Sequence, residues 1–504
     1  MAHIAFMSSS YLTNDLRFMI SFLCRSFSNR WFSFFALLFT SVFASIFSPA
    51  AYAADLTPLA ITSNLWALPF AGMLLSIALF PIFAANFWHH HYGKVAAVWG
   101  LLFLLPALAS FGVSPTLAQV WHVMLQEYVP FLILLFTLYT VAGGVALVGN
   151  LHGGAALNTG LLALGAALAG VMGTTGAAML LIRPLLRAND HRAHRVHIVI
   201  FFILLVANAG GGFTPLGDPP LFIGFLKGVS FAWTAQHMFA PTLLVIACLL
   251  TFFFLLDYFY FHQKNADVAR PDPTPDTRVH LLGKRNLVLL LVVVGAVILS
   301  GVWKPGIVLQ VGSEPLPLEN LVRDLILFAC AALSRSFTPA AARRANDFNW
   351  GPIAEVAKLF AAIFLTIIPV LALLKQGAHG PFAGLLVLLS DAQGQALPVM
   401  YFWLSGILSA FLDNAPTWLV FFNLAGGDPV ALMQADSGAG KTLLAISCGA
   451  VFMGALTYIG NAPNFMVKAI AEQNGIRMPS FFAYLLWASL ILLPVFVLVA
   501  TVFF

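Results

Sequence analysis

The chain has 504 residues, of which 61% are hydrophobic and 9% are charged, and its formal net charge is +5. Soluble domains contain about 45–50% apolar and about 25% charged residues, so this chain has too few charged side chains to cover a water-facing surface. Uncharged tracts of membrane-spanning length, about 17–25 residues, recur at 129–149, 198–217, 238–256 and 481–504. The composition predicts an all-α polytopic membrane protein and excludes soluble enzymes and nucleic-acid-binding proteins.

The N-terminal region has the layout of a signal peptide. Arg25 and Arg30 precede the apolar tract 31–48, and a small-x-small sequence follows at 51–53. This order is typical of a cleaved secretory signal. We therefore expect residues 1–53 to be a signal peptide, with an uncleaved first helix as the alternative. Cleavage would leave the new N-terminus outside and make 89–94 the first cytoplasmic loop.

The rest of the chain is predicted to contain about 11–13 membrane segments, several of them interrupted. Residues 54–126 would form an N-terminal helix pair and a polar exterior loop around 114–126. Two long apolar regions follow, at 127–261 and 355–504. Between them lie a proline-rich, basic linker at 262–286, which the positive-inside rule places in the cytoplasm, and linking helices at 287–354.

The two long apolar regions resemble each other. The sequence TPLGDPP at 214–220 parallels TYIGNAP at 457–463, with the shared pattern T-x-x-G-[D/N]-x-P. About 40 residues before each lies a second helix breaker, at 173–176 in one region and 413–417 in the other. The glycine content also indicates that 155–182 is not one plain helix. We infer that 127–261 and 355–504 are two transporter repeats.

Paired breaks in duplicated apolar segments are typical of secondary transporters, which bind their substrates near the membrane midplane. A broken helix frees N–H and C=O groups, and these are costly in lipid unless protein or a water-filled cavity covers them. Freed carbonyl groups can bind a cation, and freed N–H groups can bind an anion. A plain kink explains one break, but four at matching positions favour a binding site.

Asp218 and Asp413 lie inside the broken motifs, and ionisable residues within membrane segments are usually functional. Desolvation and a neighbouring like charge both favour the protonated form of a carboxyl group. The pair is therefore suited to exchanging a proton for a sodium ion. Capping of the next helix is the alternative for Asp218. Glu127 and Glu355, at the edges of their spans, are expected to be interfacial or helix-capping.

Neutral side-chain oxygens near these aspartates are suited to a small hard cation. The candidate binding residues are Asn208, Thr174, Thr175, Thr214, Asn414, Thr417, Thr457, Asn461 and Asn464.

Two other motifs are given no chemical role. The sequence SGAGKT at 437–442 ends like a phosphate-binding loop, but Ala435 stands where the first glycine belongs and no βαβ unit surrounds it. The consecutive histidines 89–91 are expected in a solvated loop rather than at a metal site.

Three sequences resemble the ion transporter superfamily, in particular the putative citrate transport family, whose members are often labelled sodium/proton antiporters. They are NAGGGFTPLGDPPLF at 208–222, LDNAPT at 412–417 and TYIGNAPN at 457–464. Residues 87–94 (FWHHHYGK) are also similar to that family's first loop. The D-type sodium/proton antiporters and arsenite permeases are more distant relatives.

The resemblance implies a homodimer in which each protomer has a scaffold part and a mobile part, with two inverted repeats, broken helices and re-entrant hairpins. Residues 174–176 and 413–417 would form the tips, and 214–220 and 457–464 the unwound segments facing them. Carboxylate transporters of the superfamily typically have Ser-Asn-Thr tips. This chain has GTT and DNA there instead, which favours a cation site.

The leading hypothesis is sodium/proton antiport in a bacterial-type inner membrane, with Asp218 and Asp413 binding either ion. The alternative is proton- or sodium-coupled transport of citrate or a similar carboxylate. A gated channel or a structural membrane protein is a third class, which the duplicated breaks argue against. We expect no enzymatic activity and no cofactor, and the expected partners are the lipid bilayer, a small ion or carboxylate and a second copy of the chain.

Overall fold

The computed structural model describes residues 59, 61–260, 277–312, 314–434 and 438–504. The predicted signal peptide, residues 1–53, and most of the linker lie outside the described residues. The described chain is helical apart from two small antiparallel sheets. One pairs β1 (Ala146–Val148) with β2 (His280–Leu282), and the other pairs β3 (Val308–Val311) with β4 (Glu314–Pro317). The prediction of an all-α architecture is confirmed.

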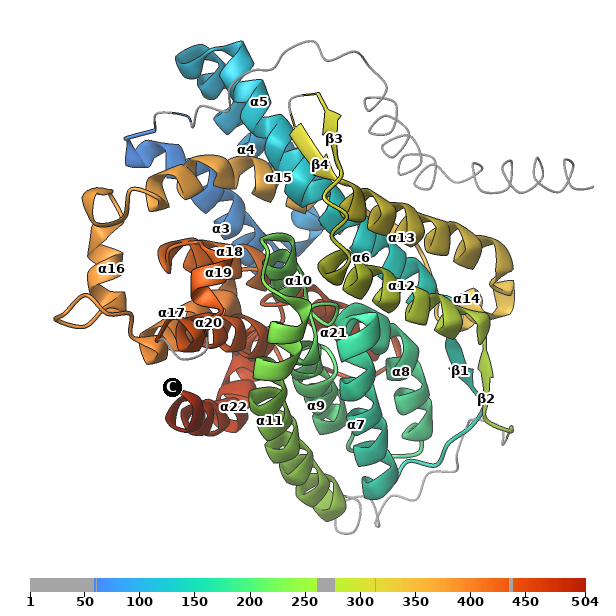
Figure 1. Cartoon of the computed structure of the whole chain (residues 1–504). Helices are drawn as coiled ribbons and strands as arrows, with labels where there is room; N and C mark the ends of the chain where they lie inside the picture. The colour runs from blue at the N-terminus through green and yellow to red at the C-terminus, as the bar shows by residue number, and fades with distance from the viewer. Residues whose placement is uncertain (1–58, 60, 261–276, 313, 435–437) are drawn as a thin grey trace, which may run out of the picture.

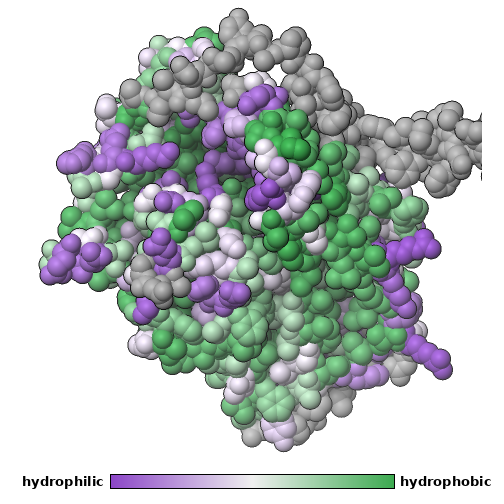
Figure 2. All heavy atoms as spheres, viewed as in Figure 1, coloured by the Kyte–Doolittle hydropathy of each residue, from purple (hydrophilic) through white to green (hydrophobic). Residues whose placement is uncertain are grey.

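Ten helical stretches among the described residues are long and apolar enough to cross a membrane. With α17 (Pro398–Phe411), a shorter apolar helix, the count reaches eleven, the lower end of the predicted range. Large apolar side chains remain exposed on these helices; Phe239 and Leu255 of α11 (Phe231–Phe259) are 53% and 61% exposed. Figure 2 shows this apolar surface over the lower and right-central parts of the view, while hydrophilic side chains lie in the upper and left parts and along the right edge. Such a surface requires lipid as its solvent.

The helices pack as two groups (Figure 1). The scaffold group contains η1 (Asn64–Ala67), α3 (Leu68–Phe83), α4 (Ala85–Phe111), α5 (Val113–Val123), the π-helical turn η2 (Met124–Tyr128), α6 (Val129–Ala142), α12 (Arg285–Val302), α13 (Leu318–Phe337), α14 (Ala340–Ala345) and α15 (Gly351–Leu374).

The second group, here called the site group, contains the interrupted segments. Its members are α7 (Ala155–Met172), α8 (Thr174–Ala188), α9 (Val196–Leu205), η3 (Ala209–Phe213), α10 (Pro219–Leu226), α11, α17, α18 (Asn414–Leu424), α19 (Pro429–Leu432), α20 (Gly438–Met453), η6 (Gly454–Leu456), α21 (Ala462–Gln473) and α22 (Phe481–Phe503). The short η5 (Gly377–His379) and α16 (Ala383–Leu389) lead from α15 to α17.

The first helices of the two repeats, α6 and α15, run antiparallel within the scaffold group. Phe131 of α6 stacks on Phe360 of α15 at 4.8 Å between ring centroids. Further along α6, Tyr139 lies 5.2 Å from Phe348, just before α15 begins. Rising residue numbers on one helix therefore face falling numbers on the other. Equivalent helices of opposite direction are what inverted repeats produce.

Each repeat contains a helical hairpin and an interrupted helix, as predicted. The first hairpin, α7–α8, turns at Gly173, whose φ of 76° suits a residue without a Cβ atom. The second, α17–α18, turns at Leu412–Asp413. The interrupted helices are α9–α10 and α20–α21, which unwind around 206–218 and 454–461. The expectation that 155–182 is broken is therefore confirmed.

Two predicted loops are helical in the structure. The polar exterior loop expected at 114–126 is wrong, because α5 and η2 occupy that segment. Its polar residues are typical of a loop, but Thr116 and Val123 are buried, so tertiary packing stabilises a helix there. The first cytoplasmic loop expected at 89–94 is also wrong, since these residues lie inside α4.

The packing of α20 against α17 gives a stability prediction. A Cβ atom at Gly449 of α20 would lie 2.4 Å from the carbonyl oxygen of Phe402 on α17. We expect Gly449→Ala to destabilise the protein by about 1–3 kcal/mol through overpacking, seen as a lower melting temperature in detergent. Gly295→Ala on α12 is the control, since no atom lies within 4 Å of its new Cβ. Equal melting temperatures for both variants would contradict this packing.

Candidate functional site

Four helices begin at one place in the site group. They are α8, which starts at Thr174; α10, which follows Asp218; α18, which starts at Asn414; and α21, which follows Asn461. Each start follows one of the four predicted breaks, and the two repeats supply two starts each. A helix N-terminus carries partial positive charge. The four helix starts together can therefore stabilise a negatively charged group without the help of a cationic side chain.

Asp218 receives a hydrogen bond from each of the other three starts. The Asn461 amide donates to Asp218 Oδ1 at 3.1 Å, and the Asn414 amide donates to Oδ2 at 2.5 Å. The Thr174 hydroxyl donates to Oδ1 at 3.4 Å. All four residues are at most 3% exposed. The carboxylate is therefore buried among neutral donors, one from each break.

Buried amides satisfy the carbonyl groups that the unwound segments leave free. Asn464 donates to the carbonyl oxygens of Gly454 and Thr457, at 2.9 Å each. Asn208 donates to Asn464 Oδ1 at 2.7 Å, and Asn461 donates to the Ala207 carbonyl at 3.1 Å. These contacts connect the two repeats and link Asn208 and Asn464 to the carboxylate through Asn461.

The two motif threonines do the same work in each repeat. The Thr214 hydroxyl donates to the carbonyl of Gly170 in the first hairpin at 2.6 Å, and the Thr457 hydroxyl donates to Ala410 in the second hairpin at 2.5 Å. Each hydroxyl also accepts from the backbone N–H two residues later. Both threonines thus hold an unwound segment against its hairpin.

The motif glycines permit close backbone approach at matching positions. A Cβ atom at Gly217 would lie 2.2 Å from the carbonyl oxygen of Gly211, and one at Gly460 would lie 2.6 Å from that of Gly454. The spacing of six residues is the same in both repeats. A larger residue at either position would push apart the two backbone stretches of the unwound segment that carries Asp218 or Asn461.

Asp413 and Asp218 differ in their surroundings. Asp218 occupies the N-cap position of α10, but its side chain makes no capping hydrogen bond. The Asp413 carboxylate does cap its helix, accepting from Ala415 N–H at 3.2 Å, and it interacts electrostatically with Asp218. The Thr417 hydroxyl donates to the Asp413 carbonyl at 2.9 Å. Thr175 is only partly buried and makes no hydrogen bond to Asp218.

One oxygen beside the carboxylate has no partner. Asn414 Oδ1 is buried and accepts no hydrogen bond from any described residue, although the same side chain donates to Asp218 through Nδ2. An unsatisfied buried acceptor costs about 1–3 kcal/mol. A cation or a protonated group beside Asp218 would satisfy it.

Sequence reasoning missed a second buried charged cluster. Arg192 contacts both oxygens of Asp257, at 2.5 and 3.1 Å. His197 contacts Oδ1 at 2.8 Å, and the Asn158 amide donates to Oδ2 at 2.9 Å. One sequence feature indicates this cluster: Asp257 directly follows the uncharged tract 238–256. This cluster joins α7, α9 and α11 at the far end of α11 and has no hydrogen bond to Asp218.

The comparisons with known proteins agree with the resemblance noted in the sequence. A family model described as putative citrate transport matches residues 60–504. A search of curated proteins finds no match.

The amide network gives a prediction that separates it from ordinary surface amides. Asn464→Ala would remove the donor to two buried carbonyl groups, at about 1–3 kcal/mol for each group, and would leave the Asn208 amide with its bond to the Ile203 carbonyl. We expect a clearly lower melting temperature in detergent. Asn423→Ala is the control, because Asn423 is partly exposed and donates only to Leu419 in its own helix. Similar melting temperatures for the two variants would show that the network adds little stability.

Proposed function

The chain belongs to the putative citrate transport family, and from this premise we propose that it exchanges sodium ions for protons at Asp218. It is a multi-pass membrane transporter of that family. The proposed exchange rests on one observation: the buried Asp218 carboxylate accepts a hydrogen bond from a neutral donor at each of the other three helix starts.

The charge balance of the site supports a cationic substrate. Ionised carboxylates are costly to bury unless a counter-ion accompanies them. Asp218 has no Lys, Arg or His among its hydrogen-bond partners in the described chain, so a proton or a metal cation would supply the missing positive charge. Asp413 adds a second negative group nearby. The free oxygen of Asn414 would complete an all-oxygen shell, which suits a hard cation.

Competition between the two ions explains coupling. A proton and a sodium ion would neutralise the same carboxylate, so they would bind one at a time. If only the neutralised site crosses the membrane, each sodium ion exported requires protons to return. The inward proton gradient then drives sodium out.

The same geometry supports one alternative. The four helix N-termini at the site, together with the amides of Asn414 and Asn461, would also favour an anion. Citrate or a similar carboxylate would then be the substrate, as the family description suggests, with Asp218 and Asp413 binding the coupling ion. Absence of a cationic side chain at Asp218 favours antiport over this alternative.

We further propose that the protein acts as a homodimer in a bacterial-type inner membrane without a cofactor. The family resemblance supports the dimer, and the basic sequence of the linker supports a cytoplasmic face on that side.

Replacement of the two aspartates tests the site. In everted vesicles with a pH-sensitive dye, sodium should dissipate an imposed proton gradient. We expect Asp218→Asn and Asp413→Asn to reduce this exchange to background while the proteins still insert, because neither amide can exchange a proton for sodium. Asp428→Asn is the matched control: Asp428 is an exposed N-cap that accepts from Val430 N–H at 2.9 Å. Full exchange in Asp218→Asn would remove that residue from the mechanism.

The same vesicles distinguish the two functions. Radiolabelled citrate and sodium are supplied separately to wild-type protein. If citrate accumulates and sodium leaves the proton gradient unchanged, antiport is wrong and carboxylate transport is the function.

A further inference from the structure

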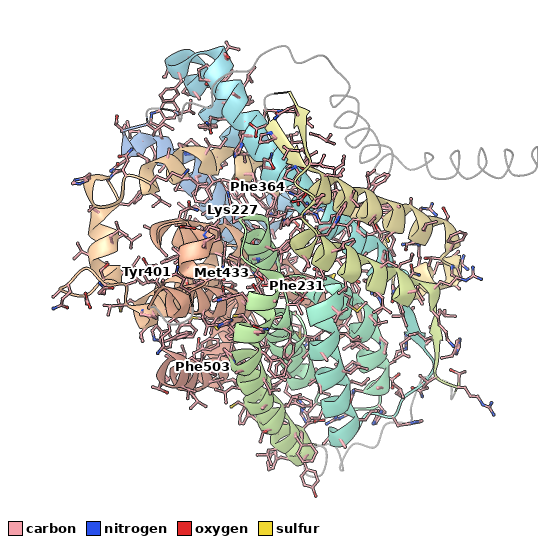
Figure 3. All side chains as sticks on the ribbon, viewed as in Figure 1. Lys227, Phe231, Phe364, Tyr401, Met433 and Phe503 are labelled. Carbon is pink, nitrogen blue, oxygen red and sulfur yellow. The ribbon has the colours of Figure 1, made fainter. Side chains whose placement is uncertain are left out.

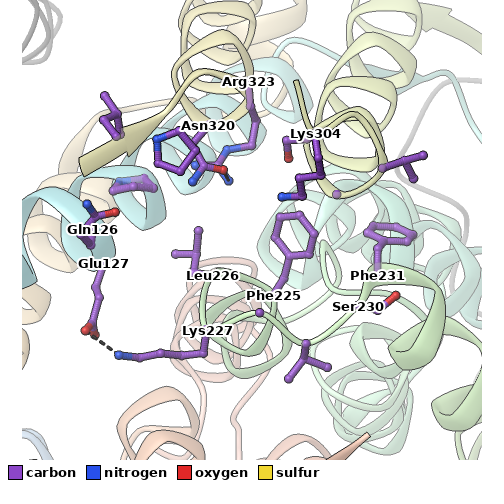
Figure 4. A pocket seen from close by; sticks show the side chains of 18 of the residues that line it. Gln126, Glu127, Phe225, Leu226, Lys227, Ser230, Phe231, Lys304, Asn320 and Arg323 are labelled. Atoms are coloured by element: carbon purple, nitrogen blue, oxygen red, sulfur yellow. Dashed lines mark hydrogen bonds and ion pairs between the residues drawn. The ribbon is translucent and has the colours of Figure 1, made fainter. Parts of the chain in front are cut away.

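One ion pair joins the two helix groups near the end of α10. Lys227 Nζ lies 2.5 Å from Glu127 Oε1. Glu127 belongs to η2 of the scaffold group, and Lys227 directly follows α10 of the site group. Figure 3 places Lys227 at the end of the site group that faces α6, and Figure 4 shows the pair itself. Sequence analysis expected Glu127 to be interfacial or helix-capping; instead its side chain is 8% exposed and ion-paired.

The pair lies on the helix that carries the candidate site. Helix α10 has eight residues and begins directly after Asp218, so at 1.5 Å per residue it is about 12 Å long. Asp218 is at one end and Lys227 is at the other. A helix this short moves as a unit, so the position of Lys227 against the scaffold also sets the position of Asp218.

A cavity of about 710 Å³ separates the groups beside the pair. Asn320, Arg323 and Lys304 line it on the scaffold side, and Phe225 and Phe231 line it on the site side (Figure 4). Open space replaces side-chain packing here. The ion pair at the edge of this space is thus a polar bridge across a loosely packed boundary.

Among the described residues, Lys227 is the ion-pair partner of the buried Glu127 side chain. Glu127 Oε2 is buried and has no hydrogen-bond partner among the described residues. A buried carboxylate with one partner removed is an uncompensated charge, which is strongly unfavourable. Glu127 also lies in a π-helical turn, and such turns occur often at functional sites. Opening the pair is therefore unfavourable unless water or another cation reaches Glu127.

We infer that Glu127 and Lys227 are positioning residues that latch α10, and with it Asp218, to the scaffold group. The latch stabilises the conformation described here and opens whenever the site group moves relative to the scaffold. This inference rests on the proposed transport function, because only a transporter needs that movement. Glu127 and Lys227 act through the position of Asp218 and do not themselves bind the transported ion.

Chemical cross-linking tests whether the latch must open. In the double variant Glu127→Cys/Lys227→Cys, a bifunctional thiol reagent with a reducible spacer as long as the original ion pair should stop sodium-dependent exchange, and reduction should restore it. The spacer is needed because a direct disulfide is shorter than the two extended side chains that it would replace. Each single variant must keep its exchange after the same treatment. The control is Lys304→Cys/Glu319→Cys, which replaces an ion pair of 3.3 Å within the scaffold group. Continued exchange in the fully cross-linked Glu127/Lys227 variant would overturn the latch.

Labelling gives a readout that does not require transport. A Thr175→Cys reporter on the partly buried hairpin tip is reacted with an impermeant maleimide from each membrane face. Glu127→Gln should move the two labelling rates in opposite directions and change their ratio by about tenfold, as expected when a partly buried ion pair no longer biases two states. Glu319→Gln should leave both rates unchanged, and the charge swap Glu127→Lys/Lys227→Glu should restore them.

The outcomes separate the latch from the proposed function. Unchanged labelling in Glu127→Gln, with sodium-dependent exchange intact, would overturn the latch and leave antiport standing. A labelling change that the charge swap reverses, in a protein with no sodium-dependent exchange, would support the latch and overturn antiport. If Glu127→Gln does not insert, Lys227→Met replaces it as the test variant.

Discussion

The structure of this protein depends on satisfying backbone groups that four broken helices leave free in an apolar environment. Lipid offers no hydrogen bonds, so every exposed N–H or C=O group must find a partner within the protein. Here Thr214 and Thr457 bind hairpin carbonyls, and Asn464 binds two carbonyls of its own unwound segment. Because these partners come from different elements, the breaks are stable only together. The same requirement that stabilises the fold therefore gathers polar side chains into one buried site.

The site is nearly symmetric, and the unwound segments differ at the motif position that carries Asp218. Asp218 and Asn461 occupy the same motif position in the two repeats and hydrogen-bond each other at 3.1 Å. Two carboxylates at this distance would repel in a low-dielectric site, whereas a carboxylate and an amide attract. The duplication thus provides matching geometry, and the difference at this motif position places a carboxylate where the repeats meet. Under the proposed function, that carboxylate, without a cationic partner, suits the site to a proton or a sodium ion.

In the proposed mechanism, ion binding and movement are connected through α10. The helix carries the site at one end and contacts the scaffold group at the other, where Lys227 meets Glu127 beside a cavity. The two groups also contact each other directly, as α6 does with α8, so the cavity marks the part of their boundary where packing is loosest. The buried cluster of Asp257, Arg192 and His197 lies at the other end of α11 and stabilises the site group internally. The proposed movement would therefore carry the candidate site as a unit, with the hydrogen bonds around Asp218 intact.

The sequence alone determined the features that arise locally. Composition identified a membrane protein, and glycine, proline and polar residues marked each break, because a helix interior cannot accommodate them without exposing backbone groups. Tertiary structure decided which polar residues meet. Asp218 contacts Asn414 and Asn461 across 196 and 243 positions, while Asp413, which the sequence analysis paired with Asp218, caps its own helix. The helix α5 and the ion pair of Glu127 with Lys227 were likewise not predicted. These features depend on how distant helices pack, and no local pattern of residues encodes that arrangement.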